Sequence, residues 1–332
     1  MQHRAHARHR PLAVRLAHRR DGGHPAGHRG IVKVRIGFGF GVRTKLNDSG
    51  FAEVVDALEA LRFDSLWLSE RIGGDAPDPL VAMSFAAGRT QRLKFGMSVM
   101  VLPGRNPIVL AKELATLDRL SNGRLLPAFG LGVADPHEQQ AFGVERGARA
   151  KMFDEALAVL RGCWSAEPLT HHGEHFHYDN LQVRPKPLQH HVDVWLGGIA
   201  PSELRRVGRL ADGWLPSFVT PDDAARGREI IEATCALHHR TIEDDHYGVL
   251  VPYANGPVPD AVLAGLAARR PDLADPSVLI PTGWDALLDT IDRFVAVGTT
   301  KFVILPIVEP ASPAAWVQHL EEAAPIVSAR QT

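Results

Sequence analysis

Few cysteines and little net charge characterise this sequence. Its 332 residues include only two cysteines, Cys163 and Cys235, which lie far apart and in no metal-ligand spacing. This scarcity argues against a disulfide scaffold or a cysteine zinc site and fits a reducing cytoplasm. The formal net charge of −1 gives no footprint of a nucleic-acid-binding protein.

Long hydrophobic runs are also missing. No apolar stretch reaches the roughly 18 residues of a membrane-spanning helix, and the longest, near Val99, is interrupted by Pro103. We therefore expect a soluble, cytoplasmic protein that contacts neither membrane nor nucleic acid. With 45% hydrophobic and 23% charged residues, the chain can bury a large core, as one large α/β domain or two smaller ones.

Residues 1–30 differ in composition from the remainder. They contain seven Arg and six His against one acid, Asp21, and they lack the apolar core or amphipathic face of a targeting peptide. Two interpretations stay open, a disordered basic tail or translated upstream sequence ahead of a working start near Val32 or Val34. We assign this segment no function and expect residues 31–328 to form a single domain.

Eight short apolar runs after Ile31 predict eight buried strands. They are VKVRIGFGF, FDSLWLSE, LKFGMSVMVL, GRLLPAFGLGV, VDVWLGG, DGWLPSF, HYGVLVPY and KFVILPI. Between them apolar residues recur at three- and four-residue spacing, as at Phe51, Val54, Val55 and Leu58, which is typical of amphipathic helices. Strand and helix alternating eight times predict an α/β fold, a closed (β/α)8 TIM barrel. The GFGFG at 37–41 lacks the G-x-G-x-x-G spacing of an open dinucleotide-binding sheet.

Two stretches are longer than the loops that a minimal (β/α)8 barrel needs. Residues 165–190 precede the fifth strand and residues 253–281 follow the seventh, and insertions at strand ends usually shape a pocket. The first contains four histidines, His171, His172, His175 and His177. No carboxylate or cysteine set at ligand spacing accompanies them, and they alternate with aromatic residues, so we expect an exposed hairpin and no metal.

The fifth strand ends in two glycines, Gly197 and Gly198, and Pro201 then begins a helical pattern. In a TIM barrel the ligand site lies at the carboxyl ends of the strands. Glycine lets a ligand approach the backbone, and the free N–H groups at a helix start attract anions. The segment therefore predicts a phosphate-binding loop, with a simple tight turn as the alternative.

Four longer motifs carry a family resemblance. They are LWLSER, GMSVMVLPGRNPIVLAKELATLDRLSNGRL, AFGLGV and WLGGIAPSELRRVGRLADGW. Together they resemble the luciferase-like monooxygenase superfamily, and the chain looks most like the branch that uses the deazaflavin coenzyme F420, whereas sister branches use FMN. The resemblance implies hydride transfer between F420 and a small organic substrate, in a homodimer formed through helices near the second and third strands. An FMN-dependent monooxygenase and a cofactor-binding barrel without turnover are the alternatives.

The resemblance also implies site residues. A bulge of the third strand, often with a cis peptide, would lie under the cofactor ring at Ser98 and Val99, and backbone N–H groups of the fifth-strand loop would hold its phosphate. The implied cofactor-binding set is Glu70, Arg71, Ser98, Val99, Met100, Gly130, Gly132, Gly197, Gly198, Ile199 and Ser217. The pocket is expected to be apolar, with Phe40, Trp67, Met100 and Phe218 near strand ends.

The sequence departs from its relatives at two positions. Many deazaflavin relatives have an acid followed by His where this chain has Glu70 and Arg71, and Arg cannot titrate near neutrality. Val133 replaces the Glu of sugar-phosphate-oxidising relatives, which disfavours that reaction. The catalytic acid or base is therefore unassigned, with Glu70 and Arg71 as candidates. Nearby Asp135, His137 and Glu138 offer proton chemistry, and Arg105 either meets an anionic part of the cofactor or caps its loop.

Overall fold

The computed structural model describes residues 33–46 and 49–332, and the expectation for residues 1–30 lies outside them. Eight strand positions form the barrel wall, and the third and fourth are each divided into two short strands. The wall strands are β1 (Arg35–Phe40), β2 (Ser65–Leu68), β3 (Lys94–Met97), β4 (Met100–Val101), β5 (Leu125–Leu126), β6 (Ala128–Gly130), β9 (Trp195–Leu196), β10 (Gly213–Trp214), β11 (Gly248–Tyr253) and β12 (Lys301–Pro306). All eight predicted strands are present.

The strands pair in parallel and close on themselves. One sheet runs β11-β12-β1-β2-β3-β5 and the other β10-β9-β6-β4. Because β3 and β4 belong to one wall position and β5 and β6 to the next, the two sheets are continuous. Parallel bridges from Trp214 to Tyr247 and from Ser217 to Leu250 join the sixth position to the seventh. The predicted (β/α)8 barrel is confirmed.

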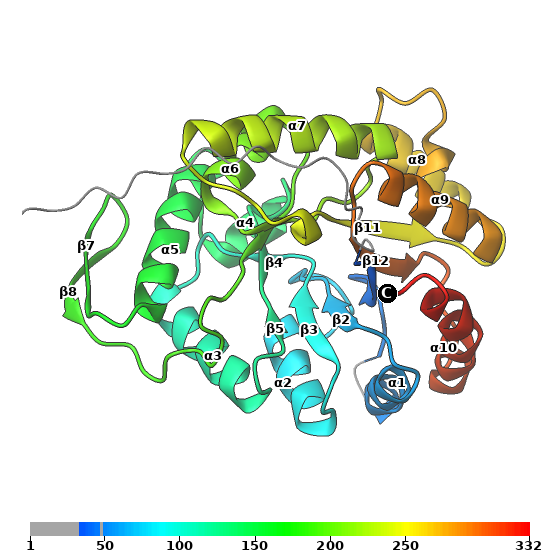
Figure 1. Cartoon of the computed structure of the whole chain (residues 1–332), viewed down its shortest axis with the longest axis horizontal. Helices are drawn as coiled ribbons and strands as arrows, with labels where there is room; N and C mark the ends of the chain where they lie inside the picture. Colours follow the sequence, from blue (N-terminus) through cyan, green and yellow to red (C-terminus); the bar gives the residue numbers. More distant parts are fainter. Residues whose placement is uncertain (1–32, 47–48) are drawn as a thin grey trace, which may run out of the picture. The chain divides into compact units, whose positions relative to one another are not determined.

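Helices surround this wall (Figure 1). The principal ones are α1 (Ser49–Ala60), α2 (Pro79–Arg89), α3 (Pro107–Leu120), α5 (Arg149–Trp164), α6 (Pro201–Leu210), α7 (Pro221–Leu237), α9 (Trp284–Ala296) and α10 (Pro313–Ser328). Five of these eight begin with proline, which suits the first helical turn because its missing N–H would have no intrahelical partner. Asp78 and Asn106 cap α2 and α3 by accepting backbone N–H groups.

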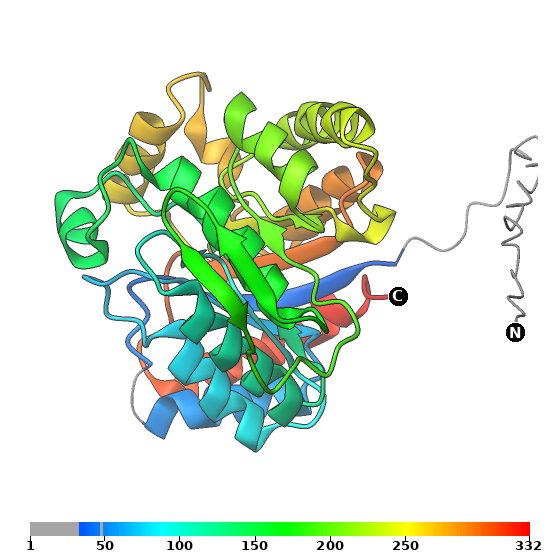
Figure 2. The same ribbon diagram turned by 90° about the vertical axis from the view of Figure 1, so that its left-hand side faces the viewer.

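Both predicted insertions are present. The first forms the antiparallel hairpin of β7 (Leu169–His172) and β8 (His177–Leu181), which lies outside the barrel wall (Figure 2). Phe176 and Tyr178 stack at 6.5 Å on its packed face, whereas His172 is exposed. The predicted hairpin is therefore confirmed. The second insertion contains α8 (Asp260–Arg269) and the short helix η2 (Pro276–Leu279), and α4 (Pro136–Phe142) and η1 (Asp244–His246) lie in other loops.

Side chains of each strand alternate between the barrel interior and the outer core beneath the helices. On β1, Phe38 and Phe40 point outward and are almost fully buried. Gly39 points inward, where a Cβ atom would lie 2.9 Å from Val303 Cγ1. The glycines of GFGFG therefore mark positions of the strand where the filled barrel interior leaves no room for a side chain. The interior itself is filled by Trp67, Ala128, Trp195, Leu215, Leu250 and Val303.

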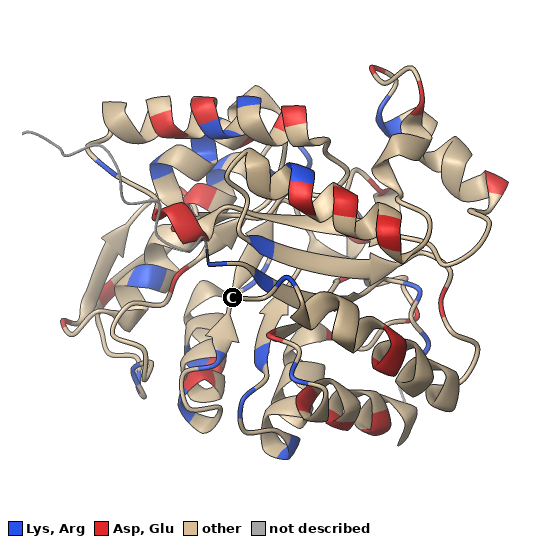
Figure 3. Cartoon of the chain, turned by 45° about the vertical axis from the view of Figure 1, so that its right-hand side comes forward, with Lys and Arg blue, Asp and Glu red and all other residues tan. Residues whose placement is uncertain are grey.

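Acidic and basic side chains are interspersed on the helices (Figure 3). Within the described ranges, no helix is both long and apolar enough to cross a membrane.

Candidate functional site at the barrel mouth

Small residues occupy the last inward position at the carboxyl ends of most strands. Each lies two residues beyond an inward-facing position of the layer below, which is a glycine at Gly39 and Gly96, so the strand alternation points it inward as well. These residues, which we call the mouth floor, are Gly41, Ser69, Ser98, Gly130, Gly197 and Ser217. All six are half-buried, whereas the layer beneath is nearly inaccessible. The filled barrel therefore ends in a surface with little side-chain relief and three hydroxyl groups.

Val99 lies in the middle of this floor. The peptide bond between Ser98 and Val99 is cis, at the position that the family resemblance implied. A Cβ atom on Gly130 would lie 2.5 Å from Val99 Cγ2, and one on Gly197 would lie 3.7 Å from Val99 Cγ1. Gly130 thus provides the space for Val99. Among the described residues, Ser98 Oγ is buried without a hydrogen-bond partner.

The structure corrects the expectation for Met100. Its side chain is fully buried in the outer core rather than facing the mouth. After the cis bond the third strand resumes with the opposite alternation, so Val99 takes the inward position and Met100 points toward the helices. Phe40 is likewise in the outer core, and Trp67 lies beneath the mouth floor. Phe218 packs in a separate cluster with the second insertion.

The loop after the fourth strand is held by Arg149, which the sequence did not single out. Its Nη1 donates to the carbonyl oxygens of Leu131, Gly132 and Val133 at 3.3, 3.1 and 2.8 Å. Gly132 has a φ of +79°, and a Cβ atom there would lie 3.1 Å from Val101 Cγ1. A side chain at Gly132 would therefore be strained and crowded, and the contact of a cofactor ring with Gly132 stays a prediction.

The predicted phosphate loop presents its amide groups at the start of α6. The N–H groups of Ile199 and Ala200 both donate to Glu203 Oε2, at 3.0 Å each. Gly198 has a φ of +96°, and a Cβ atom there would lie 2.7 Å from the Glu203 side chain. The loop therefore holds an anionic group, but that group is a carboxylate of the same chain. Sequence reasoning missed Glu203.

Glu70 and Arg71 are both engaged in ion pairs. The Glu70 side chain is only 3% exposed, accepts the N–H of Val101 at 2.7 Å and pairs with Arg105. Burial raises the pKa of Glu70, although Arg105 and the Val101 N–H act against that rise. Arg105 also donates to the Val101 carbonyl oxygen at 2.8 Å. The Glu70–Arg105 pair therefore ties the end of the second strand to the third.

Arg71 contacts α4 instead of projecting freely into the mouth. It pairs with Asp135 at 3.2 Å and with Glu138 at 3.4 Å. Asp135 also caps α4, and hydrogen bonds from the backbone, first of all the His137 N–H, lower the pKa of its carboxyl. Glu138 is buried. Both acids that seemed available for proton chemistry are thus occupied in holding Arg71.

The mouth has a further carboxyl group that the sequence did not predict. Glu309 follows β12, is half-buried, and accepts a hydrogen bond from Thr44 Oγ1 at 2.5 Å. Burial raises the pKa of Glu309. No local motif marks it, because Thr44 lies 265 residues earlier in the chain.

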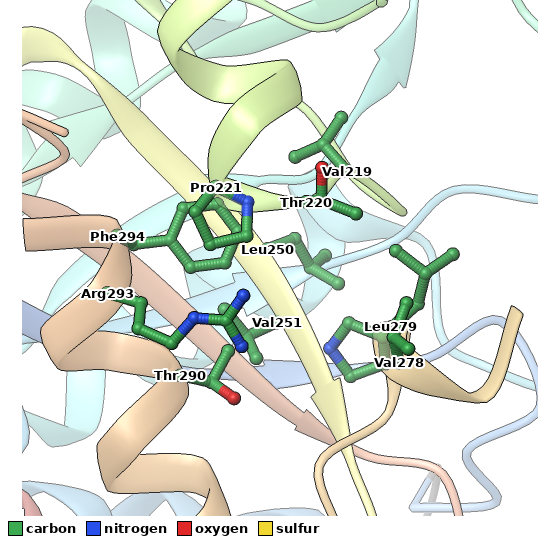
Figure 4. Close-up of a pocket in the computed structure, with 11 residues that line it drawn as sticks. Val219, Thr220, Pro221, Leu250, Val251, Val278, Leu279, Thr290, Arg293 and Phe294 are labelled. Atoms are coloured by element: carbon green, nitrogen blue, oxygen red, sulfur yellow. The ribbon is translucent and has the colours of Figure 1, made fainter. Parts of the chain in front are cut away.

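Two cavities lie away from the mouth floor. One, of about 40 Å³, is enclosed by β11, the start of α7, η2 and α9, and Arg293 projects into it (Figure 4). Its volume suits a few water molecules and is too small for a flavin-sized ring. The other is an open groove of about 700 Å³ between α2 and α3 on the outside of the barrel. None of the predicted cofactor residues lines either cavity.

Two side-chain clusters of metal-binding type lie near the opposite ends of the strands. They are His191, Asp193 and Asp212, and Glu243, Asp245 and His246. Asp212 pairs with Arg161 at 2.6 Å, and Asp245 pairs with Lys33 at 2.7 Å. These clusters precede β9, β10 and β11, so they are remote from the mouth floor.

Comparisons with known proteins agree with this fold. The profile of the luciferase-like monooxygenase family matches residues 39–294. A Mycobacterium tuberculosis protein provisionally named a coenzyme F420-dependent oxidoreductase is 32% identical over 197 residues, which are 54% of each chain. The chain spans 63% of an uncharacterised Mycobacterium bovis relative, so it covers less than two thirds of either protein.

Solved structures share the fold. An F420-dependent secondary alcohol dehydrogenase in complex with an F420-acetone adduct has a TM-score of 0.73 at 20% identity, covering 89% of this chain and 99% of that one. The oxygenating constituent of 3,6-diketocamphane monooxygenase from Pseudomonas putida, in complex with FMN, has a TM-score of 0.70 at 17% identity, covering 90% and 99%. At these identities the likeness shows the barrel architecture.

Proposed function

The chain belongs to the luciferase-like monooxygenase family, and from this premise we propose that it is an oxidoreductase that transfers a hydride between coenzyme F420 and a small organic substrate. The names of the provisionally assigned mycobacterial relative and of the alcohol dehydrogenase support F420 as the cofactor. The observation that carries the proposal is the mouth floor, where this chain combines a surface of small residues with an adjacent pair of amides that bind a carboxylate.

The mouth floor fits a flat tricyclic ring. Gly130 and Gly197 leave no side chain above the backbone, and Val99 offers an apolar contact in the middle of the surface. The buried hydroxyl of Ser98 lacks a partner among the described residues, and a ring carbonyl or N–H would supply one. When bound, F420 supplies a carbon atom that accepts or donates a hydride. The protein's own part is to support the ring and hold the substrate against its open face.

The start of α6 fits the cofactor's phosphate. The amides of Ile199 and Ala200 already bind a carboxylate oxygen, and the positive end of the helix dipole favours an anion there. Ser217 ends the neighbouring sixth strand, where its hydroxyl would add a donor. A phosphate can bind these two N–H groups only after the Glu203 side chain has rotated away from them.

Binding of the two candidate cofactors tests the proposal. Purified protein is titrated separately with oxidised F420 and with FMN while fluorescence is followed. We expect saturable binding with a lower Kd for F420. In Gly197→Val the branched side chain would cover the floor beside Val99, and we expect the F420 affinity to fall at least about tenfold. Gly147→Val is the matched control, since a Cβ atom there meets nothing within 4 Å.

The same titration addresses the alternative, an FMN-dependent monooxygenase. The family includes monooxygenases, and the diketocamphane enzyme with FMN has the same barrel. Tighter binding of FMN, with oxygen consumption after its reduction, would favour this alternative. Failure to bind either cofactor would leave the cofactor-binding role of the mouth floor without support.

We also propose that the chain forms a homodimer through α2 and α3. Their outer face carries large exposed apolar side chains, including Val81 at 69% exposure and Leu120 at 78%, along the open groove. Contiguous exposed apolar surface of this kind marks an interaction site. Light scattering after size exclusion should give a dimer for the native chain and a monomer for the double variant Val81→Glu/Leu120→Glu. Leu237→Glu on α7, where Leu237 is 80% exposed, should remain dimeric.

A further inference from the structure

The loop after the eighth strand carries a carboxyl group, that of Glu309, at the mouth. Val303 and Leu305 face the barrel interior, and Glu309 follows in the loop beyond β12. A Cβ atom on Gly41 would lie 3.7 Å from Glu309 Oε1 and 3.9 Å from Leu305 Cδ1. Because Gly41 belongs to the mouth floor, this places the Glu309 carboxyl at the floor's edge, above the first and eighth strands.

Glu309 differs from the other acids of the mouth in its partners. Glu70 pairs with Arg105, Glu138 pairs with Arg71, and Glu203 binds two amides. Within the described ranges, Glu309 makes no ion pair, and the Thr44 hydroxyl on Oε1 is its one hydrogen-bond donor. Among the described residues its Oε2 has no hydrogen-bond partner, and Oε1 can accept a second hydrogen bond beside the one from Thr44.

Resting on the hydride-transfer function proposed above, we propose that Glu309 is the acid–base residue that exchanges a proton with the substrate's oxygen atom, in an alcohol or ketone. When the alcohol is oxidised, its C–H bond breaks and the hydride leaves with both electrons to the bound cofactor. Its O–H proton passes to the Glu309 carboxylate, which becomes a neutral acid. Reduction of the ketone reverses both transfers, so atoms and charge balance.

The electrostatic surroundings suit this role. Burial raises the pKa of Glu309, whereas the Thr44 hydroxyl and the more distant, exposed Arg43 oppose the rise. A carboxyl with a raised pKa is a better proton donor near neutrality than an ordinary glutamate. Thr44 is fully buried, so its hydroxyl is a fixed donor that positions Oε1, the carboxyl oxygen that lies near the mouth floor at Gly41.

Infrared spectroscopy tests the placement without turnover. The difference spectrum between native protein and Glu309→Gln, recorded from pH 4 to 8, isolates the carboxyl stretch of Glu309. We expect a protonated band with a midpoint above 4.5 that shifts when F420 or FMN saturates the protein. A band that titrates at or below 4.5, or that ignores both bound cofactors, would overturn the assignment. If neither cofactor binds, the cofactor proposal fails, while the band's midpoint still reports whether Glu309 is perturbed.

Turnover then tests the proton transfer itself, with 2-propanol and acetone as probes in the two directions. For whichever probe the native protein converts, we expect Glu309→Gln to lower kcat at least 100-fold and to change the F420 Kd less than twofold. Glu321→Gln, an exposed control on α10, should keep full activity. Thr44→Val should move the pH midpoint upward, since the hydroxyl stabilises the carboxylate. Retention of kcat within threefold in Glu309→Gln would refute the role.

Discussion

Replacing Glu203 by Gln should strengthen cofactor binding while weakening the fold. In the native chain a phosphate must displace the carboxylate from the N–H groups of Ile199 and Ala200, each 3.0 Å from Oε2. Hydrogen bonds to charged groups contribute about 1.5–3 kcal/mol each, and a neutral amide oxygen retains about half of that. Over the two hydrogen bonds the phosphate therefore gains about 1.5–3 kcal/mol relative to its competitor, which corresponds to roughly ten- to hundredfold tighter binding.

The same change removes a negative charge from the start of α6. Such a charge contributes about 0.3–1 kcal/mol through the helix dipole, so the free energy of unfolding should fall by about that amount in addition to the loss in the two hydrogen bonds. Fluorescence titration with F420 or FMN gives the Kd, and urea unfolding gives the stability. Glu229→Gln is the matched control, because Glu229 is exposed on α7. An unchanged or weaker affinity in Glu203→Gln would refute the idea that the phosphate and Glu203 share one pair of amides.

Three further changes test other parts of the structure. Gly130→Ala would place a Cβ atom 2.5 Å from Val99 Cγ2 and should lower the free energy of unfolding by about 1–3 kcal/mol. Gly88→Ala is the control, because its Cβ atom on α2 would meet open space and should not lower the stability. Urea unfolding compares the two variants. Asp64→Asn should cost about 3–5 kcal/mol, because Lys301, only 8% exposed, would remain buried without its partner. Burial alone would raise the pKa of Asp64, but Lys301 and Lys94 hold it at about 2, below its ordinary value of 3.8. The contribution of Asp64 to stability is therefore complete above about pH 4 and is lost as the pH falls through 2. Acid unfolding of the native protein and of Asp64→Asn can check this. Arg149→Met should weaken cofactor binding about tenfold in the fluorescence titration, because Nη1 no longer fixes the carbonyls of residues 131–133.

Most of the barrel could be predicted because each buried parallel strand is a short apolar run between amphipathic helices. The loop at Gly197 and Gly198 could also be predicted, since glycine followed by Pro201 marks both a close backbone approach and a helix start. Glu203 escaped because a carboxylate folding back onto amides is usually signalled by a Ser or Thr cap, and the residue before Pro201 is Ala200.

Two other features have no local sequence signal. Met100 was assigned to the mouth from the family resemblance and from its position near a strand end, whereas the alternation of the third strand changes at Ser98–Val99 and turns Met100 toward the helices. Glu309 depends on Thr44 from the opposite end of the chain, so only the closure of the barrel brings them together. Neither feature is marked by a short sequence pattern, whereas the strands and helices that were predicted correctly are marked by patterns of neighbouring residues.

A crystal structure with F420 or FMN bound tests the central claim most directly. We expect the ring to lie on Val99 and the mouth floor, and the phosphate to accept the N–H groups of Ile199 and Ala200, with Glu203 displaced. A cofactor bound elsewhere, or one bound at the mouth while Glu203 still holds both amides, would contradict this account.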